Sequence, residues 1–251
     1  MTHICCIAAH DTSNGAGITR DCIVAYDFGV MAHPAITALT TQSFDHVESI
    51  WPIPVNRFVN QLNSIAFNFS LSAIKIGMLY SPDLVNIVAD FIANHQDIPI
   101  IVDPIITSSG GEPLVTSDAM QLIISRIIPF AKLISPNRYE FEILSKHKVD
   151  GRNDTLSTAR EFAIKHNCKV LLKGGHFEGS ILTDFLVDEN EIIEVPHERR
   201  KYTFSHGSGC VLSTAITCSL ALGYSYRQAL SHAVDYTLRY FDSMNIALMH
   251  Q

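Results

Sequence analysis

Short apolar runs alternate with helix-like runs along almost the whole chain, and this alternation is the feature that most constrains its fold. Buried-strand patterns occupy residues 3–9, 35–42, 73–79, 98–104, 131–137 and 168–175. Helical spacing occupies residues 18–28, 55–67, 81–95, 116–128, 138–146 and 155–166. A strand hairpin over 181–195, turning near Asp188–Asn190, precedes closing helices at 209–222 and 226–245. The pattern predicts an α/β fold in three αβα layers, with a mostly parallel central sheet and helices on both faces.

Length and charge limit the class of protein. The chain has 251 residues, 47% of them hydrophobic, which suits one domain over residues 1–251. The net charge of −7, without a Lys/Arg run, predicts that nucleic acid is not a partner. The apolar runs are too short to span a bilayer, so we expect no membrane partner. Because the six cysteines show no C-x-x-C spacing, we expect reduced thiols and a cytoplasmic protein.

The predicted strands end in polar residues or glycines. In open parallel sheets, ligands bind beyond the carboxyl ends of the strands. The candidates at these ends are Asp11, Gly15, Gly17, Gln42, Met78, Asp103, Asn137, Glu140, Lys173, Gly174 and Gly175. Each is ordinary for a loop. Six strand ends that converge on one edge are better explained by a binding site.

The stretch "TFSHGSGCVLST" (203–214) predicts a helix whose first turn carries few side chains. Glycines disfavour a helix interior, whereas the residues from Val211 onward have the spacing of a buried helical face. The first N–H groups of such a helix lack intrahelical partners and lie at the positive end of its dipole. This start therefore predicts an anion-binding site. Because a helix N-terminus lowers a thiol pKa, we expect Cys210 to have a chemical role.

Missing motifs narrow the chemistry further. The sequence has no P-loop, no G-x-S-x-G elbow and no zinc-ligand spacing, and "NGAGITR" lacks the third glycine of a dinucleotide-binding loop. What remains is the anion site at 207–210, Lys173, and two carboxylates, Asp103 and Glu140, that suit a hard cation such as Mg²⁺. This combination favours phosphoryl transfer without a P-loop.

Several segments resemble the ribokinase-like superfamily in order and spacing. They are "HDTSNGAGI" (10–18), "ITALTTQ" (36–42), "KIGML" (75–79), "SPNRYE" (135–140), "LLKGGH" (171–176) and "GSGC" (207–210). Within it, the chain is similar to hydroxymethylpyrimidine/phosphomethylpyrimidine kinases of thiamine biosynthesis. The resemblance implies ATP-dependent phosphorylation of 4-amino-5-hydroxymethyl-2-methylpyrimidine and/or its monophosphate, with ATP and Mg²⁺ bound and a homodimer as the assembly.

The same resemblance implies roles for individual residues. Catalytic roles fall to Gly207, Ser208, Gly209 and Cys210. Pyrimidine binding falls to Ala9, Asp11, Ala16, Asp21, Gln42, Met78 and Ile105. Nucleotide binding falls to Asn137, Lys173, Gly175 and Ser205, and Mg²⁺ binding to Asp103 and Glu140. His206 matches a family histidine that we expect to shape its loop rather than to act on the substrate.

The sequence departs from the family pattern in two loops. The first reads "AAHDTSNGAG" where the family has A-G-S-D-P-S-G-G-A-G, so Ala9 replaces a glycine beside the ring site. In the other, Ser109 replaces a lysine. The altered first loop keeps open a vitamin B6 (pyridoxal) kinase. A second alternative, supported only by these changes, is a pyrimidine-binding protein without catalytic activity.

Overall fold

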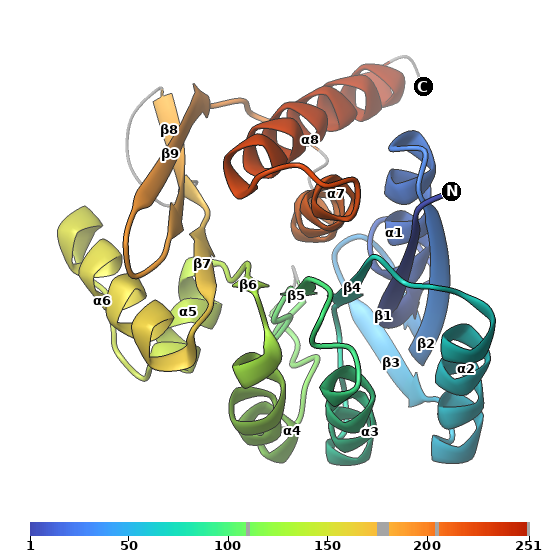
Figure 1. Cartoon of the computed structure of the whole chain (residues 1–251). Helices are drawn as coiled ribbons and strands as arrows, with labels where there is room; N and C mark the ends of the chain where they lie inside the picture. The colour runs from blue at the N-terminus through green and yellow to red at the C-terminus, as the bar shows by residue number, and fades with distance from the viewer. Residues whose placement is uncertain (109–110, 175–180, 204–205, 250–251) are drawn as a thin grey trace.

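The computed structural model describes residues 1–251 apart from 109–110, 175–180, 204–205 and 250–251. At its centre the described strands form a nine-stranded sheet in the order β3-β2-β1-β4-β5-β6-β7-β8-β9 (Figure 1). The strands are β1 (His3–Asp11), β2 (Met31–Gln42), β3 (Val47–Pro52), β4 (Ala73–Ile76), β5 (Ile100–Val102), β6 (Leu133–Ile134), β7 (Lys169–Leu172), β8 (Ile181–Val187) and β9 (Ile192–Glu198).

Six neighbouring strands, β2, β1, β4, β5, β6 and β7, run parallel. Antiparallel strands extend the sheet at both ends: β3 beside β2, and the β8–β9 hairpin beside β7. The mostly parallel sheet predicted from the sequence is thus confirmed. It carries the ends of the six parallel strands to one edge.

Helices cover both faces of the sheet, as predicted (Figure 1). They are α1 (Gly17–Asp27), α2 (Val55–Asn68), α3 (Pro82–Ala93), α4 (Ser117–Leu122), α5 (Arg138–Ser145), α6 (Gly151–His166), α7 (Ser208–Ala221) and α8 (Tyr226–Met249). Strand alternation explains the layers. In β1, Cys5 and Ile7 pack with α2–α6, whereas Ile4 and Cys6 pack on the face of α1. The helices α1, α7 and α8 cover that second face.

Several details differ from the predicted elements; β2 and α6, for example, begin at Met31 and Gly151, before the predicted starts at 35 and 155. The edge strand β3 was not predicted, because "VESIWP" shows no clear apolar alternation. The helix expected over 116–128 is α-helical only to Leu122 and continues as a π-helical turn, Ile123–Ile127. A short 3₁₀ turn follows at Ile128–Phe130, where Pro129 lacks the N–H that a continuing α-helix would use. Of these elements, β3 reaches the carboxyl edge of the parallel strands, where Val47 pairs with Gln42.

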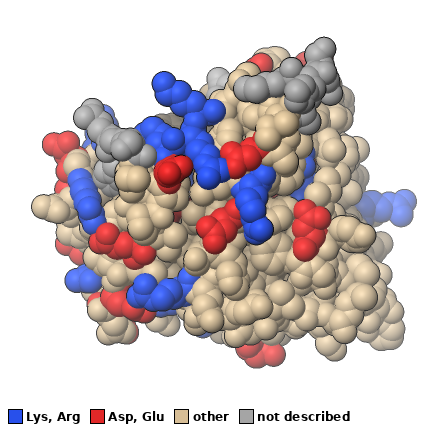
Figure 2. Space-filling model, turned by 90° about the horizontal axis from the view of Figure 1, so that it is seen from above, with Lys and Arg blue, Asp and Glu red and all other residues tan. Residues whose placement is uncertain are grey.

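The surface carries both signs of charge. Seen from above, basic and acidic side chains lie next to one another (Figure 2). In the described part of the chain, no helix combines the length and apolar character that crossing a bilayer requires.

Candidate active site

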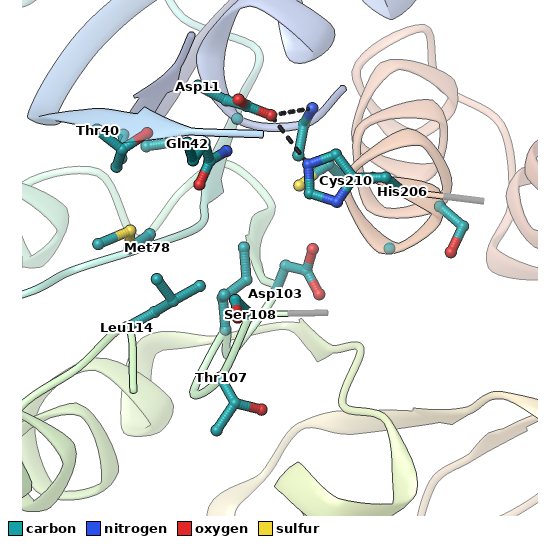
Figure 3. A pocket seen from close by; sticks show the side chains of 18 of the residues that line it. Asp11, Thr40, Gln42, Met78, Asp103, Thr107, Ser108, Leu114, His206 and Cys210 are labelled. Atoms are coloured by element: carbon teal, nitrogen blue, oxygen red, sulfur yellow. Dashed lines mark hydrogen bonds and ion pairs between the residues drawn. The ribbon is translucent and has the colours of Figure 1, made fainter. Parts of the chain in front are cut away.

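The predicted strand ends meet in a cavity of about 370 Å³ at the carboxyl edge of the parallel strands (Figure 3). Its lining contains most of the residues selected from the sequence: Ala9, Asp11, Ala16, Gln42, Met78, Asp103, Ile105, Asn137, Glu140, Lys173, Gly207, Ser208, Gly209 and Cys210. Gly175 and Ser205 lie outside the described residues. Among the described residues to which the resemblance gives a role, Asp21 alone is absent from the lining, and the strand-end glycines Gly15 and Gly174 are absent too.

The N-terminus of α7 forms one wall of the cavity. Gly207 precedes the helix with a φ of +81°, a left-handed conformation that favours glycine. Its carbonyl accepts the N–H of Val211 at 2.9 Å. No described side chain caps this helix start. The N–H groups of the first turn, in Ser208, Gly209 and Cys210, therefore have no intrahelical partner and can bind an anion.

Close contact between two loops fixes this helix start. A Cβ atom on Gly207 would lie 1.9 Å from the Gly15 carbonyl oxygen, and a Cβ on Gly15 would lie 2.1 Å from Cδ2 of His206. Neither position has room for a side chain. The loop before α1 thus packs directly on the loop before α7, and two helix N-termini meet at one end of the cavity.

Cys210 lies at this junction and is only 4% exposed. Burial raises the pKa of its thiol to about 11; the charges of Asp21 and Asp103 also raise it, whereas Lys75 and the Gly17 N–H lower it. The expectation that the helix N-terminus would lower this pKa was wrong, because burial has the larger effect. In the free protein Cys210 is a neutral thiol at pH 7.

Lys173 and Asp103 stand beside the helix start. Lys173 Nζ lies 3.8 Å from Asp103 Oδ1. The Asp103 carboxylate also accepts hydrogen bonds from the hydroxyls of Ser135 and Ser213, each at 3.2 Å. A Cβ on Gly209 would lie 3.2 Å from Lys173 Nζ and 3.5 Å from Asp103 Oδ2. Glycine at 209 therefore keeps open the space between the helix N–H groups, the ammonium and the carboxylate.

Asn137 and Glu140 form a capping box at the start of α5. The Asn137 side chain accepts the Glu140 N–H at 2.9 Å, and Glu140 Oε2 accepts the Asn137 N–H at 2.8 Å. Burial raises the pKa of Glu140 to about 7, and the charge of Asp103 adds to the rise, whereas Lys173 and backbone N–H groups oppose it. Glu140 thus both orders the turn after β6 and places a second carboxyl group beside Asp103.

Asp11 organises the first loop. Its carboxylate accepts the Ser13 N–H and the Ala16 N–H, both at 2.7 Å, and its Oδ2 lies 3.0 Å from His206 Nε2 (Figure 3). Burial alone would raise the pKa of Asp11, but the interactions with His206, Ser13 and Gln42 together outweigh it and hold the pKa well below its ordinary value. Asp11 lines the cavity as predicted, and its bonds are to the protein's own loops.

The opposite wall is mainly apolar. Ala9, Ala38, Met78 and Leu114 form a small cluster there, with Ile105 packed against it. The hydroxyl of Thr37 donates to the Met78 carbonyl at 2.8 Å and fixes the backbone of that residue. Gln42, at the end of β2, adds an amide at the rim (Figure 3). An apolar slot with one amide suits a flat heteroaromatic ring.

Gly17, a candidate at the end of the first strand, lines the cavity as well. The structure adds lining residues that the sequence analysis did not select: Ala8, His10, Thr40, Thr107, Ser108, Leu114 and His206. Thr40 could have been predicted from the sequence, because alternate residues of a strand share a face and Gln42 follows two residues later. The others line the cavity through tertiary contacts. Ser108, for example, donates a hydrogen bond to Glu112, which lies 2.6 Å from His46 Nδ1 and so links Ser108 to the β2–β3 turn.

Asp21 corrects one expectation. It is fully buried in α1, where both of its oxygens accept hydrogen bonds from Lys75 Nζ, at 2.9 and 2.8 Å. Thr214 in α7 donates a third at 2.7 Å. Lys75 is equally buried in β4, and the charge of Asp21 outweighs the burial of the ammonium and raises its pKa. Asp21 therefore links α1, β4 and α7 below the cavity and makes no contact with its space.

The donors present suit a magnesium ion that arrives with a nucleotide. Within the described residues, no three His, Cys, Asp or Glu side chains gather as a metal cluster. Mg²⁺ usually takes one or two protein carboxylates and completes its shell with water and phosphate oxygens. Asp103 and Glu140 supply that number of carboxyl groups in one lining. They fit a nucleotide-borne Mg²⁺ better than a permanently bound metal.

Comparison with known proteins identifies relatives over most of the chain. Residues 11–250 match the family described as phosphomethylpyrimidine kinase. The hydroxymethylpyrimidine/phosphomethylpyrimidine kinase of Streptomyces coelicolor is 33% identical over 230 residues, which cover 92% of this chain and 85% of the relative. The enzyme of the same name from Bacillus subtilis is 30% identical over 231 residues, covering 92% and 85%.

Solved structures with the same fold include a member of this family and a pyridoxal kinase. The phosphomethylpyrimidine kinase of Clostridium difficile 630 superposes with a TM-score of 0.84 at 28% identity, covering 96% of this chain and 99% of the other. A pyridoxal kinase of Staphylococcus aureus in complex with AMP-PCP superposes with a TM-score of 0.85 at 24% identity, covering 95% and 87%. The second likeness shows a shared ribokinase-like fold.

Proposed function

The chain belongs to the phosphomethylpyrimidine kinase family, and from this we propose how its cavity transfers the terminal phosphoryl group of ATP to 4-amino-5-hydroxymethyl-2-methylpyrimidine or its monophosphate. The protein is a phosphotransferase, and its relatives are named as kinases and as multifunctional proteins of thiamine biosynthesis. The observation that carries the residue assignment is the convergence of the α7 N-terminus, Lys173 and Asp103 on one wall, opposite an apolar slot.

The α7 wall takes the phosphoryl group. The transition state of phosphoryl transfer is loose, so the protein contributes mainly position and charge stabilisation. The first-turn N–H groups at Ser208, Gly209 and Cys210 are fixed in place before the ligand binds. Fixed donors of this kind need no reorganisation during the reaction. Lys173, 23% exposed at its side chain, adds a cation that can move the short distance from Asp103 to a phosphate oxygen.

Asp103 and Glu140 would hold the Mg²⁺ that accompanies ATP, which supplies charge neutralisation on the phosphates. The charges of both carboxylates would otherwise repel the nucleotide. Ionised Glu140 is disfavoured by burial in the free protein, so the cation also compensates its charge.

Cys210 positions the acceptor. A thiol whose pKa is raised to about 11 is a poor base at neutral pH. In a loose transition state the bond to the attacking oxygen is barely formed, so the hydroxyl proton leaves late and can pass to an oxygen of the transferred phosphoryl group without a strong base. The thiol instead packs beside the acceptor oxygen and keeps it in line with the phosphoryl group. The amide of Gln42 and the slot of Ala9, Met78 and Ile105 hold the ring.

A substrate assay tests the proposal. Purified protein with Mg·ATP is offered hydroxymethylpyrimidine, its monophosphate and pyridoxal in parallel, with ADP release as the readout. We expect turnover with at least one of the pyrimidines at a higher kcat/KM than with pyridoxal. Cys210→Ala should bind ATP normally and lose most of its turnover. Turnover of pyridoxal alone would contradict the proposed pyrimidine substrate. A fully active Cys210→Ala variant would contradict the proposed role of the thiol.

A further inference from the structure

Asp184 is a buried carboxylate that the mechanism above does not use. It lies in β8, is 6% exposed, and stands behind the cavity wall formed by Lys173. Isolated carboxylates are rarely buried, because removing the charge from water is costly. Its described contacts are therefore informative.

The first contact is with the backbone that follows Lys173. The N–H of Gly174 donates to Asp184 Oδ1 at 2.6 Å. The ladder between β7 and β8 pairs Val170 with Val187, Leu171 with Leu186 and Leu172 with Phe185, and ends there. Lys173 and Asp184 would form the next pair of this register. Instead, the carboxylate of Asp184 accepts the N–H of Gly174 and so holds the backbone that directly follows Lys173.

The second contact is with a histidine. Asp184 Oδ2 lies 3.5 Å from Nε2 of His197, which is on the neighbouring strand β9. The nearby carboxylate of Asp184 raises the pKa of His197, and this effect exceeds the opposing effect of burial. The hairpin thus supplies both the carboxylate and its partner.

Gly174 also packs closely on the neighbouring strand β8. A Cβ atom on Gly174 would lie 2.3 Å from the carbonyl oxygen of Thr183. The turn is therefore pressed against the β8 backbone on one side and bonded to Asp184 on the other. The side chain that this turn carries is Lys173, whose ammonium lies 3.8 Å from Asp103.

We propose that Asp184 is a positioning residue, which sets the Lys173–Gly174 turn and thereby places the Lys173 ammonium where the phosphates of the nucleotide meet the α7 N-terminus. The inference rests on the proposed nucleotide site. A displacement of about 1 Å in a reacting group can reduce the rate about 100-fold, so a hydrogen bond behind the wall can control the chemistry in front of it.

The experiment compares variants of Asp184 in the full-length protein. Asp184→Ala removes the acceptor for the Gly174 N–H, whereas Asp184→Asn keeps an acceptor oxygen and removes the charge. Asp188→Ala is the matched control. Asp188 directly follows the last residue of β8, and it forms an ion pair with Lys169 rather than a bond with Gly174. KM and kcat are measured for ATP and for the pyrimidine, and thermal unfolding is followed for each variant.

We expect Asp184→Ala to lower kcat/KM for ATP at least tenfold while KM for the pyrimidine stays within about twofold. Asp184→Asn should recover most of that loss, and Asp188→Ala should stay near the parent. In the Lys173→Ala background, Asp184→Ala should add less than a twofold further loss, because its effect passes through the lysine. An additive further loss, or an equal rise in both KM values, would overturn the proposal.

A second readout separates this inference from the proposed function. Binding of AMP-PCP with Mg²⁺ is measured by calorimetry, which needs no turnover of any acceptor. Weaker binding to Asp184→Ala than to Asp184→Asn supports the positioning role even if the acceptor has been misassigned. If Asp184→Ala does not fold, Asp184→Asn alone decides: its ATP kinetics should stay within about threefold of the parent, and a loss as large as that of Lys173→Ala contradicts the inference.

Discussion

Two lysine–aspartate pairs lie close to the same helix, α7, and differ in nearly every physical respect. Lys75 and Asp21 are both completely buried, with Nζ 2.8 Å from Oδ2. Lys173 and Asp103 are 3.8 Å apart, and the lysine side chain is 23% exposed at the cavity. The first pair has short, multiple hydrogen bonds, and the second leaves most of the ammonium's donors available. We call Lys75–Asp21 the closed pair and Lys173–Asp103 the open pair. We infer that the closed pair stabilises the fold and that the open pair binds the ligand.

The largest expected effect comes from breaking the closed pair. Lys75→Met leaves the Asp21 charge buried without its cation, which typically costs about 3–5 kcal/mol of unfolding free energy. Urea denaturation measures the loss. Adding Asp21→Asn should restore much of it, since no unpaired charge remains and the bond from Thr214 is kept. A Lys75→Met variant as stable as the parent would show that the Lys75–Asp21 pair does not stabilise the fold.

Breaking the open pair should affect activity instead. Lys173→Met removes a cation from the phosphoryl site, and we expect kcat/KM to fall by about 10²–10³-fold, as for the loss of one preorganised donor. Thermal unfolding should barely change, because the lysine is partly exposed. The opposite pattern, an active protein that unfolds at a much lower temperature, would erase the distinction between the two pairs.

Asp11 sharpens the comparison, because it is buried and bonded to backbone N–H groups and His206 rather than to a lysine. It should behave as a closed carboxylate: we expect Asp11→Asn to lower stability at pH 7 by about 2 kcal/mol. Since its pKa is depressed in the fold, this contribution is complete above the ordinary value of 3.8 and is lost as pH falls toward the folded pKa. Urea unfolding should therefore show a smaller difference in stability between the parent and Asp11→Asn at pH 3 than at pH 7. An unchanged difference would mean that the charge of Asp11 does not stabilise the fold.

The smallest effect is expected from a substitution that narrows the space between the α7 N-terminus, Lys173 and Asp103. Gly209→Ala would place a methyl group 3.2 Å from Lys173 Nζ and 3.5 Å from Asp103 Oδ2. The flexible lysine can retreat, so the fold should tolerate the change, while kcat/KM for ATP falls about tenfold. Steady-state kinetics and thermal unfolding check both parts. Unchanged ATP kinetics would place the phosphates away from Gly209.

Local patterns predicted the layers and the strand ends well. Apolar runs and the glycine-rich helix start are short-range signals, and they located Asp103, Lys173 and Gly207–Cys210 at the cavity. The resemblance to the family added Ala9, Ala16 and Ile105, whose own sequence contexts are unremarkable, and gave a role to Gln42 and Met78 at their strand ends. Gly175 and Ser205 stay predictions, since they lie outside the described residues.

Long-range pairing could not be predicted. Asp21 and Lys75 are 54 positions apart, and Asp11 and His206 are 195 apart. The sequence did hold one neglected signal: Lys75 sits inside the apolar strand "AIKI", where a lysine needs a buried acidic partner. The pKa of Cys210 was mispredicted for a related reason, since helix position is local and burial is not.

The most direct test of the account is a crystal structure of this protein with Mg·AMP-PCP bound. We predict that the terminal phosphate lies within hydrogen-bond distance of the N–H groups at Ser208–Cys210 and of Lys173 Nζ, with the metal against Asp103 or Glu140. A triphosphate seated elsewhere, with Lys173 still directed at Asp103 alone, would contradict the account.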